Sequence, residues 1–120
     1  MQDAKPFTDS FVHRLVEVGT FDSIEADVSA PVTPEIRSFQ MQLKRDGARR
    51  VAKKGVLSHD CPPAPAVGAG KDCFVYVLAG SQVAPIGVKK LVARFRVWPA
   101  YQDGSWQVIN YDYALLPPPD

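Results

Sequence analysis

Two segments near the end of the chain, residues 88–98 and 106–113, constrain the fold more than any other feature. In the second half of the first segment every second side chain is apolar, whereas the other parity carries Arg94 and Arg96. Successive side chains of a strand point to opposite faces, so this alternation predicts a strand with one buried face. Asp103-Gly104 lies between the segments and favours a tight reversal, because glycine readily takes a positive φ. The sequence therefore predicts a long β-hairpin.

Helix patterns precede the strands. Residues 6–18 carry an apolar stripe with spacings of four, four and three, where Pro6 suits a first turn and Gly19 a stop. A short second helix is predicted to run to about Ser29, because Asp22-Ser-Ile-Glu25 resembles a capping box.

A third helix is predicted between Thr33 and Gly47. Thr33 offers a hydroxyl cap, Pro34 suits the first helical position, and Glu35 places a negative charge beside the positive end of the helix dipole. Gly47 is expected to end or interrupt this helix.

Two more strands, at residues 55–61 and 73–79, are predicted on either side of an irregular loop, residues 62–70, which holds three prolines and two glycines. Helices followed by a four-stranded meander predict an α+β domain, with the helices packed on one face of a curved, cone-like antiparallel sheet. A length of 120 residues suits one domain, which we assign to residues 1–116, followed by an extended proline-rich tail at residues 117–120.

Charge is distributed unevenly, although the formal net charge is only +1. Residues 1–36 hold seven acids and two bases, whereas residues 37–54 hold seven bases and one acid. The basic stretch is interpreted either as a solvated helix face with its trailing turn, or as a contact surface for an anionic partner such as lipid headgroups, a polymer or an acidic protein face. Nucleic acid is disfavoured, because no interleaved aromatic residues supply stacking platforms. The predicted partner-binding residues are Lys44, Arg45, Arg49, Arg50, Lys53 and Lys54.

The two cysteines, Cys61 and Cys73, flank the proline-rich loop. Placed at the end of one strand and the start of the next, they would lie opposite each other, about 5 Å apart and within reach of a disulfide. A disulfide indicates an oxidising compartment. Two alternatives stay open: unrelated buried thiols in a cytosolic protein, and a zinc site with His13 and His59, which lacks any Cys-x-x-Cys spacing.

Some residues have catalytic chemistry, but none forms a convincing site. His59-Asp60-Cys61 puts a thiol near a histidine, as nucleophilic catalysis requires, yet no oxyanion loop is recognisable and a bridged cysteine cannot attack. His13 is expected at a helix edge or in the core. Asp112 would act as a base only if it faced the interior, and solvent exposure is expected instead. Aromatic residues are expected to line the interior, as core or around an apolar ligand: Tyr76, Trp98, Trp106, Tyr111 and Tyr113. No catalytic residue, cofactor or metal is predicted.

Three N-terminal helices followed by a meander that ends in Gly104-Ser-Trp106-Gln-Val108-Ile-Asn-Tyr-Asp112 resemble the nuclear-transport-factor-2-like (cystatin-like) superfamily. Within it, the phrases Phe21-Asp22 and Gly55-Val-Leu57 resemble extracytoplasmic domains of actinobacterial Mce-associated membrane proteins. A similar fold occurs in periplasmic components of conjugation and type IV secretion. The resemblance implies a non-enzymatic scaffold in a bacterial envelope transport or secretion assembly. It further implies a domain of a membrane-anchored protein outside the cytoplasm, with other envelope proteins or a second copy as partners.

An alternative function follows from enzymes of the same superfamily. Relatives of the ketosteroid-isomerase and SnoaL type keep acids and histidines inside the cone, although their sites do not match this sequence residue by residue. The alternative is therefore a small-molecule-binding or isomerase-like protein, and it requires an internal pocket of several hundred Å³ with a buried acid or histidine.

Overall fold

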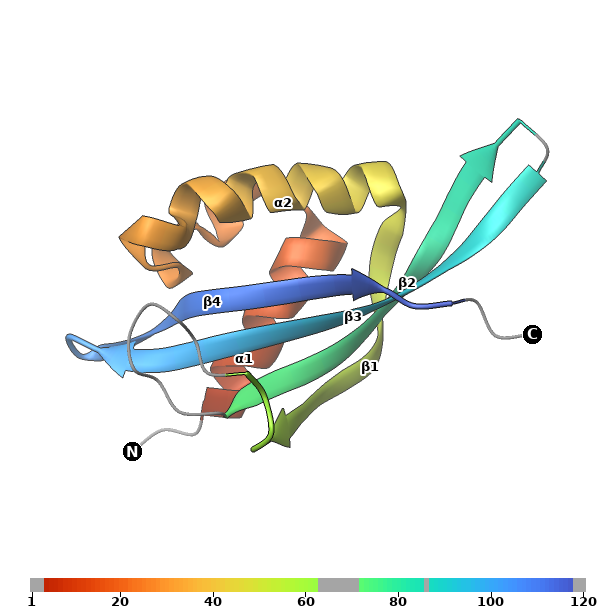
Figure 1. The fold of residues 1–120 in the computed structure, drawn as a ribbon. Helices are drawn as coiled ribbons and strands as arrows, with labels where there is room; N and C mark the ends of the chain where they lie inside the picture. Colours follow the sequence, from red (N-terminus) through yellow and green to blue (C-terminus); the bar gives the residue numbers. More distant parts are fainter. Residues whose placement is uncertain (1–3, 63–71, 86, 118–120) are drawn as a thin grey trace.

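The computed structural model describes residues 4–62, 72–85 and 87–117 of the chain (Figure 1). The predicted α+β class and the four-stranded antiparallel meander are confirmed, with the strands in the spatial order β1-β2-β3-β4. The helices are α1 (Ala4–His13) and α2 (Thr33–Asp46), and the strands are β1 (Ala48–Ser58), β2 (Cys73–Ala84), β3 (Gly87–Gln102) and β4 (Ser105–Leu115).

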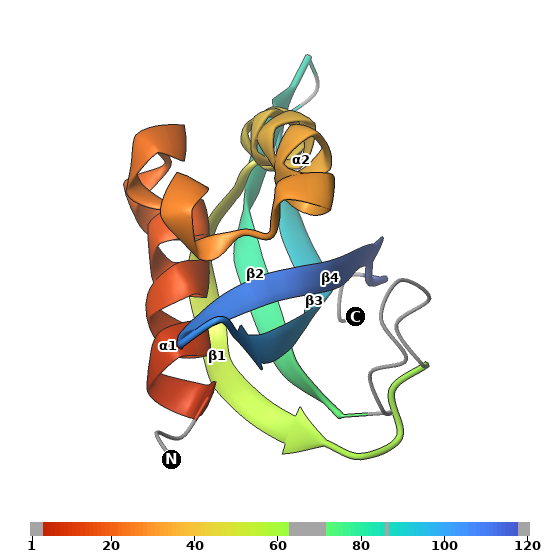
Figure 2. The same cartoon turned by 90° about the vertical axis from the view of Figure 1, so that its left-hand side faces the viewer.

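Both helices pack on the same side of a strongly twisted sheet (Figure 2). We call this side of the sheet the inner face. Phe39 of α2 packs at the centre of this face. The centroid of its ring lies 5.3 Å from that of Phe95, 4.8 Å from that of Tyr111 and 5.1 Å from that of Tyr113. Apolar side chains from all these elements fill the space between helices and sheet, among them Phe11, Leu15, Ile36, Leu43, Tyr76, Leu78, Val97 and Val108.

The first helix ends where the sequence predicts. Helix α1 continues as a π-helical turn, Arg14–Val18, and stops at Gly19, whose φ of 76° is left-handed. Ala4 and Lys5 are already helical, before the predicted start at residue 6, and Pro6 lies in the first described turn.

The predicted second helix at residues 22–29 is wrong. Three short 3₁₀ turns replace it: Phe21–Ser23, Glu25–Asp27 and Ala30–Val32. The guanidinium of Arg14 binds the Ser23 carbonyl and the Asp27 carboxylate, which holds the segment against α1. Val28 is extended and pairs in parallel with Val108 of β4, so a β-bridge takes the place of a helical turn.

Helix α2 begins and ends as predicted, but Thr33 is not its cap. Thr33 is already helical, and its hydroxyl donates to the Ser29 carbonyl at 3.1 Å. Gly47 ends the helix with a φ of 86° and donates its N–H to the Leu43 carbonyl at 3.0 Å. A Cβ at Gly47 would lie 2.1 Å from the carbonyl oxygen of Ser81, so this position requires glycine.

The predicted bounds of the first strand, 55–61, are wrong at both ends. Strand β1 begins at Ala48, directly after the glycine that ends α2, and it stops at Ser58. Register irregularities near Arg50, Lys53 and Val56 interrupt its alternation, which removed the periodic signal from the sequence. An edge strand accommodates cations and bulges. The basic residues 49–54 therefore lie on a strand, and their interpretation as a helix face with its trailing turn is wrong.

Strands β2 and β3 are longer than predicted. β1 pairs with β2 only as far as Gly80, so the tip of the β2–β3 hairpin extends beyond the rest of the sheet (Figure 1). The reversal between β3 and β4 occurs at Asp103 and Gly104, as predicted, with φ values of 53° and 83°. Most of the proline-rich loop, residues 63–71, and tail residues 118–120 lie outside the described residues.

Candidate functional site

The candidate site is the face of the sheet turned away from α1 and α2, which we call the outer face. In the part of the chain that the structure describes, no helix covers it (Figure 2). Register pairing arranges its side chains in rows across the strands. One row holds Lys53, Val77, Arg94 and Ala114, the next holds Val56, Val75, Arg96 and Asp112, and a third includes Arg50, Ala79 and Val92.

The rows build an apolar stripe between two lines of positive charge. Val75, Val77 and Ala79 of β2 form the stripe and are half-buried or buried. Arg50 and Lys53 of β1 flank it on one side, and Arg94 and Arg96 of β3 flank it on the other. Among the described residues, the flanking cations Arg50, Lys53 and Arg94 have no ion-pair partner.

Asp112 is the one acid in these rows, and Arg96 holds it. The Nε of Arg96 donates to both carboxylate oxygens of Asp112, at 2.8 and 2.9 Å, and Nη2 donates to Oδ2 as well. These hydrogen bonds raise the pKa of Arg96 against the opposing effect of burial. Asp112 therefore lies outside the helix–sheet interior, and its hypothetical role as an interior base is wrong.

Arg94 differs from its neighbour. Its Nε is buried and has no hydrogen-bond partner within the described residues. A buried donor without a partner is energetically unfavourable, by about 1–3 kcal/mol. Arg94 thus differs from Arg96 in having no carboxylate bound to it among the described residues.

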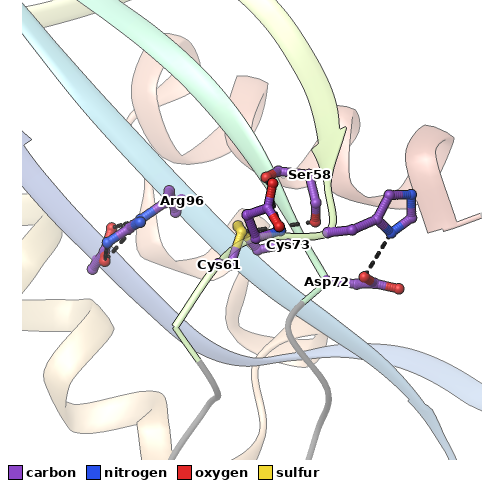
Figure 3. The surroundings of a disulfide bond; sticks show 8 residues. Ser58, Cys61, Asp72, Cys73 and Arg96 are labelled. Atoms are coloured by element: carbon purple, nitrogen blue, oxygen red, sulfur yellow. Dashed lines mark hydrogen bonds and ion pairs between the residues drawn. A yellow bond between two sulfur atoms is a disulfide. The ribbon is translucent and has the colours of Figure 1, made fainter.

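The predicted disulfide is present between Cys61 and Cys73, whose Cα atoms are 6.0 Å apart (Figure 3). Contrary to the prediction, the two cysteines do not lie opposite each other in the ladder. Ser58 is the residue paired with Cys73, and Cys61 follows the end of β1 by three residues. Both cysteines of the chain are bridged, so the alternatives with two free thiols or a thiolate nucleophile are not observed.

The disulfide belongs to a second, smaller core on the outer face. Cys61, Cys73, Trp98 and Ile109 form it, and Trp98 is only 2% exposed. The expectation that Trp98 lines the helix–sheet interior is therefore wrong. The guanidinium carbon of Arg96 lies 5.7 Å from the Trp98 ring centroid, a cation–π contact. The disulfide core thus supports the cation that binds Asp112.

The six residues predicted to bind a partner do not form one surface. Lys44 lies beside Gly19 at the end of α2, whereas Arg45 lines an open hollow with Glu35 and Tyr111. All four β1 cations are exposed, but Lys54 belongs to a pocket beside α1. The structure brings only Arg50 and Lys53 together with the cations of β3. The sequence analysis did not assign Arg94 and Arg96 to the site, although their parity in β3 placed them on the face opposite the core.

A polar pocket of about 270 Å³ lies between α1 and β1. The Tyr76 hydroxyl and Lys5 Nζ donate to different oxygens of Asp9, each at 2.6 Å. Burial opposes ionisation of Asp9, but these hydrogen bonds and the charges of Lys5 and Lys54 outweigh it, so its pKa lies below the ordinary value. Burial and the contact with Asp9 raise the pKa of Tyr76 far above its usual range. Asp9 is therefore a bonded carboxylate and Tyr76 a neutral phenol.

His13 and Glu17 occupy the rim of this pocket. Glu17 accepts the backbone N–H of Val51 at 3.0 Å and contacts His13 Nδ1 at 2.7 Å. The hydrogen bond from Val51 is the main reason that the pKa of Glu17 is lowered, against burial. The His13 side chain is 58% exposed, in agreement with a helix-edge histidine.

The remaining side chains with catalytic or metal-binding potential do not gather into one site among the described residues. His59 Nδ1 contacts Asp72 at 2.7 Å, and both side chains are exposed. In residues 4–62, 72–85 and 87–117 no group of three or more His, Cys, Asp or Glu side chains is placed to hold a metal ion. In the same residues no helix has the length and apolar character needed to cross a membrane.

Comparison with known proteins gives no match: no family model, no curated protein and no solved structure is similar to this chain. The resemblance to the nuclear-transport-factor-2-like superfamily therefore stays a prediction.

Proposed function

We propose that this protein is a non-enzymatic interaction domain that binds an acidic, amphipathic helix of a partner protein on its outer face. The observation that carries the proposal is the apolar stripe of β2, flanked by the unpaired cations Arg50 and Lys53 on one side and Arg94 on the other. A helix packs on a sheet through one apolar stripe and presents the residues that flank this stripe on both sides. Glutamates at the flanking positions would meet Arg50 and Lys53 on one side and Arg94 on the other.

The geometry favours a protein segment over a membrane. Strand twist rotates successive rows of the sheet relative to one another, so a flat lipid surface would contact only part of the apolar stripe and its flanking cations. A single helix can follow the stripe along β2. The apolar stripe would also be left against the polar headgroups in a membrane complex, whereas a helix buries it.

A second copy of the chain fits this face less well. Two outer faces would bring Arg50, Lys53 and Arg94 against the same cations of the partner, and like charges at close range repel. We therefore assign the outer face to a different, acidic partner and treat self-association as an outcome of the test.

The packing of the inner face argues against the alternative of an isomerase-like enzyme. Phe39, Phe95, Tyr111 and Tyr113 are in ring contact where a cone-shaped enzyme would hold its substrate. The polar pocket beside α1 is at the edge of the sheet, and its histidine is exposed.

A location in the bacterial cell envelope is part of the proposal. The Cys61–Cys73 disulfide is of the kind that persists in oxidising compartments. The order of helices and meander resembles envelope domains of the nuclear-transport-factor-2-like superfamily, where such domains serve transport or secretion assemblies. Both observations support a scaffold role outside the cytoplasm.

The test uses a fluorescent helical peptide with leucines along one face and glutamates beside them, and a second peptide with lysines in place of the glutamates. We expect saturable binding of the glutamate peptide alone. The R50E/K53E/R94E protein should bind about tenfold or more weakly, because three ion pairs of up to ~1 kcal/mol each are lost.

The matched control is K44E/R45E/K89E, which changes the net charge equally but alters exposed cations away from the stripe. It should retain most of the binding. Equal loss in both triple variants would reject a specific outer-face site. Binding to phosphatidylglycerol vesicles without binding to the peptide would replace the proposal with a membrane contact, and concentration-dependent dimers abolished by R50E/K53E/R94E would replace it with self-association.

A further inference from the structure

We propose a second binding site, for a neutral carbohydrate chain, in the hollow between the β3–β4 turn and the start of α1. The hollow has a volume of about 570 Å³ and is open to solvent. It belongs to neither the outer face nor the polar pocket beside β1. Its lining consists of Pro6, Phe7, Asp27, Tyr101, Gly104, Ser105 and Trp106.

Three aromatic rings form its apolar part. Phe7 and Trp106 stack at 26° with centroids 6.4 Å apart, which joins α1 to the hairpin. Tyr101 meets Trp106 edge-on at 5.3 Å and is 54% exposed. The rings are therefore preorganised, and Tyr101 presents its surface to solvent.

The turn fixes the position of Tyr101. Its hydroxyl donates to the Gly104 carbonyl at 3.1 Å, across the reversal formed by Asp103 and Gly104. A ligand that stacks on this ring would not have to order it first, which lowers the entropic cost of binding.

The polar part of the lining includes the Asp27 carboxylate and the Ser105 hydroxyl. Arg14 binds the Oδ2 oxygen of Asp27, and among the described residues Oδ1 has no hydrogen-bond partner. The Ser105 side chain is exposed next to the turn and can both donate and accept. An ionised carboxylate accepts hydrogen bonds and cannot donate them.

This combination selects among ligand classes. A sugar ring has an apolar C–H face that packs on an aromatic ring, and its hydroxyl groups donate to a carboxylate such as Asp27. A proline-rich segment also packs on aromatic grooves, but proline has no N–H and leaves the carboxylate unsatisfied. An anionic carboxylate or sulfate group has no hydrogen to donate to Asp27. A neutral carbohydrate therefore fits both parts of the lining.

The experiment titrates the protein with β-1,4-linked hexasaccharides of glucose and of N-acetylglucosamine. Trp106 lies in the hollow, so its fluorescence reports binding, and calorimetry supplies the affinity independently. We expect saturable binding of at least one hexasaccharide, with a Kd between the micromolar and millimolar range. Tyr101→Ala should weaken it about tenfold or more, because the exposed stacking surface is lost.

Tyr101→Phe retains the stacking ring but loses the hydrogen bond to Gly104, so it should lose much less affinity than Tyr101→Ala. Val88→Ala is the matched control, since it truncates an exposed apolar side chain on the other hairpin. Equal melting temperatures of all variants exclude a folding defect. Absence of saturable binding up to about 10 mM of either sugar overturns the proposal. The proposal is also overturned if a proline-rich peptide, and neither sugar, binds in a Tyr101-dependent manner. It is overturned as well if Val88→Ala loses as much sugar affinity as Tyr101→Ala.

Discussion

The hydroxyl of Tyr76 in β2 donates a hydrogen bond of 2.6 Å to the Asp9 carboxylate in α1. Tyr76 is 1% exposed, so the contact joins helix and sheet at the edge of the core. Its tight packing also explains Gly55, because a Cβ there would lie 2.4 Å from the Tyr76 ring. The hydrogen bond to Asp9 and the missing side chain at Gly55 thus both accommodate Tyr76 at the contact of α1 with the sheet.

Tyr76→Phe should lower the free energy of unfolding by about 1–2 kcal/mol at pH 7, because Asp9 loses a buried donor.

The same variant should change the acid dependence of stability. The folded-state pKa of Asp9 is depressed, so Asp9 contributes stability at pH values above its unfolded pKa of about 3.9. This contribution is lost as the pH falls through the folded-state pKa. The variant should therefore lose less stability than wild type between pH 7 and about 3. Urea unfolding at both pH values measures this, and Tyr101→Phe is the surface control. If Tyr76→Phe lost as much unfolding free energy as wild type between the two pH values, the hydrogen bond from Tyr76 would not be what lowers the pKa of Asp9.

Alkaline pH should destabilise the protein through its phenols. Burial and hydrogen bonds to Asp9 and Asp46 raise the pKa values of Tyr76 and Tyr113 well above their ordinary value. A raised folded pKa contributes stability that is complete below the unfolded pKa of about 10 and is lost as the pH rises beyond it. Unfolding free energies measured from pH 9 upward should fall, and Tyr113→Phe should flatten the decline. Ordinary titration of both phenols in the folded protein, followed by tyrosinate absorbance, would refute this explanation.

Gly55→Ala should destabilise the fold by about 1–3 kcal/mol, because the new methyl group overlaps the ring of Tyr76. In a Tyr76→Leu background the same substitution should cost much less, since the ring that it meets is gone. A double-mutant cycle by urea unfolding measures this coupling. Additive effects would show that the glycine is required for another reason.

Removal of the disulfide by Cys61→Ser with Cys73→Ser should cost about 3 kcal/mol, the loop-closure entropy for cysteines 12 residues apart. Trp98 packs on the bridge, so its fluorescence should shift to the red as its surroundings loosen. Thiol titration of the denatured, unreduced protein should find no free thiol. Two reactive thiols in protein isolated from its native compartment would reject the proposed location.

Asp112→Asn should strengthen binding of the glutamate peptide several-fold, because it removes the acid of the outer-face rows and releases Arg96. The cost in stability should stay within about 1 kcal/mol, as for other partly exposed ion pairs. The control is Asp22→Asn, which removes an exposed acid that is distant in sequence from Asp112 and belongs to no row of the outer face. If both variants strengthen binding equally, net charge and not the local cation line governs the affinity.

Signals confined to a few neighbouring residues predicted structure well. The alternation in β3, the Asp103-Gly104 reversal, and the limits of α2 near Thr33-Pro34 and Gly47 all follow from local backbone preferences. Local signals failed where a distant contact decided the conformation. The capping pattern at Asp22 gave way to 3₁₀ turns because Arg14 and β4 bind that segment.

The candidate site shows the same division. The sequence alone determined that the chain has a basic stretch, a cysteine pair able to bridge, and a strand with arginines on its non-core parity. Only the tertiary structure decided that Arg50 and Lys53 stand across an apolar stripe from Arg94 and Arg96, and that Trp98 packs beneath the disulfide. Strand register is set by contacts between segments tens of residues apart, and periodicity within one segment carries no information about which residue of the next strand lies opposite.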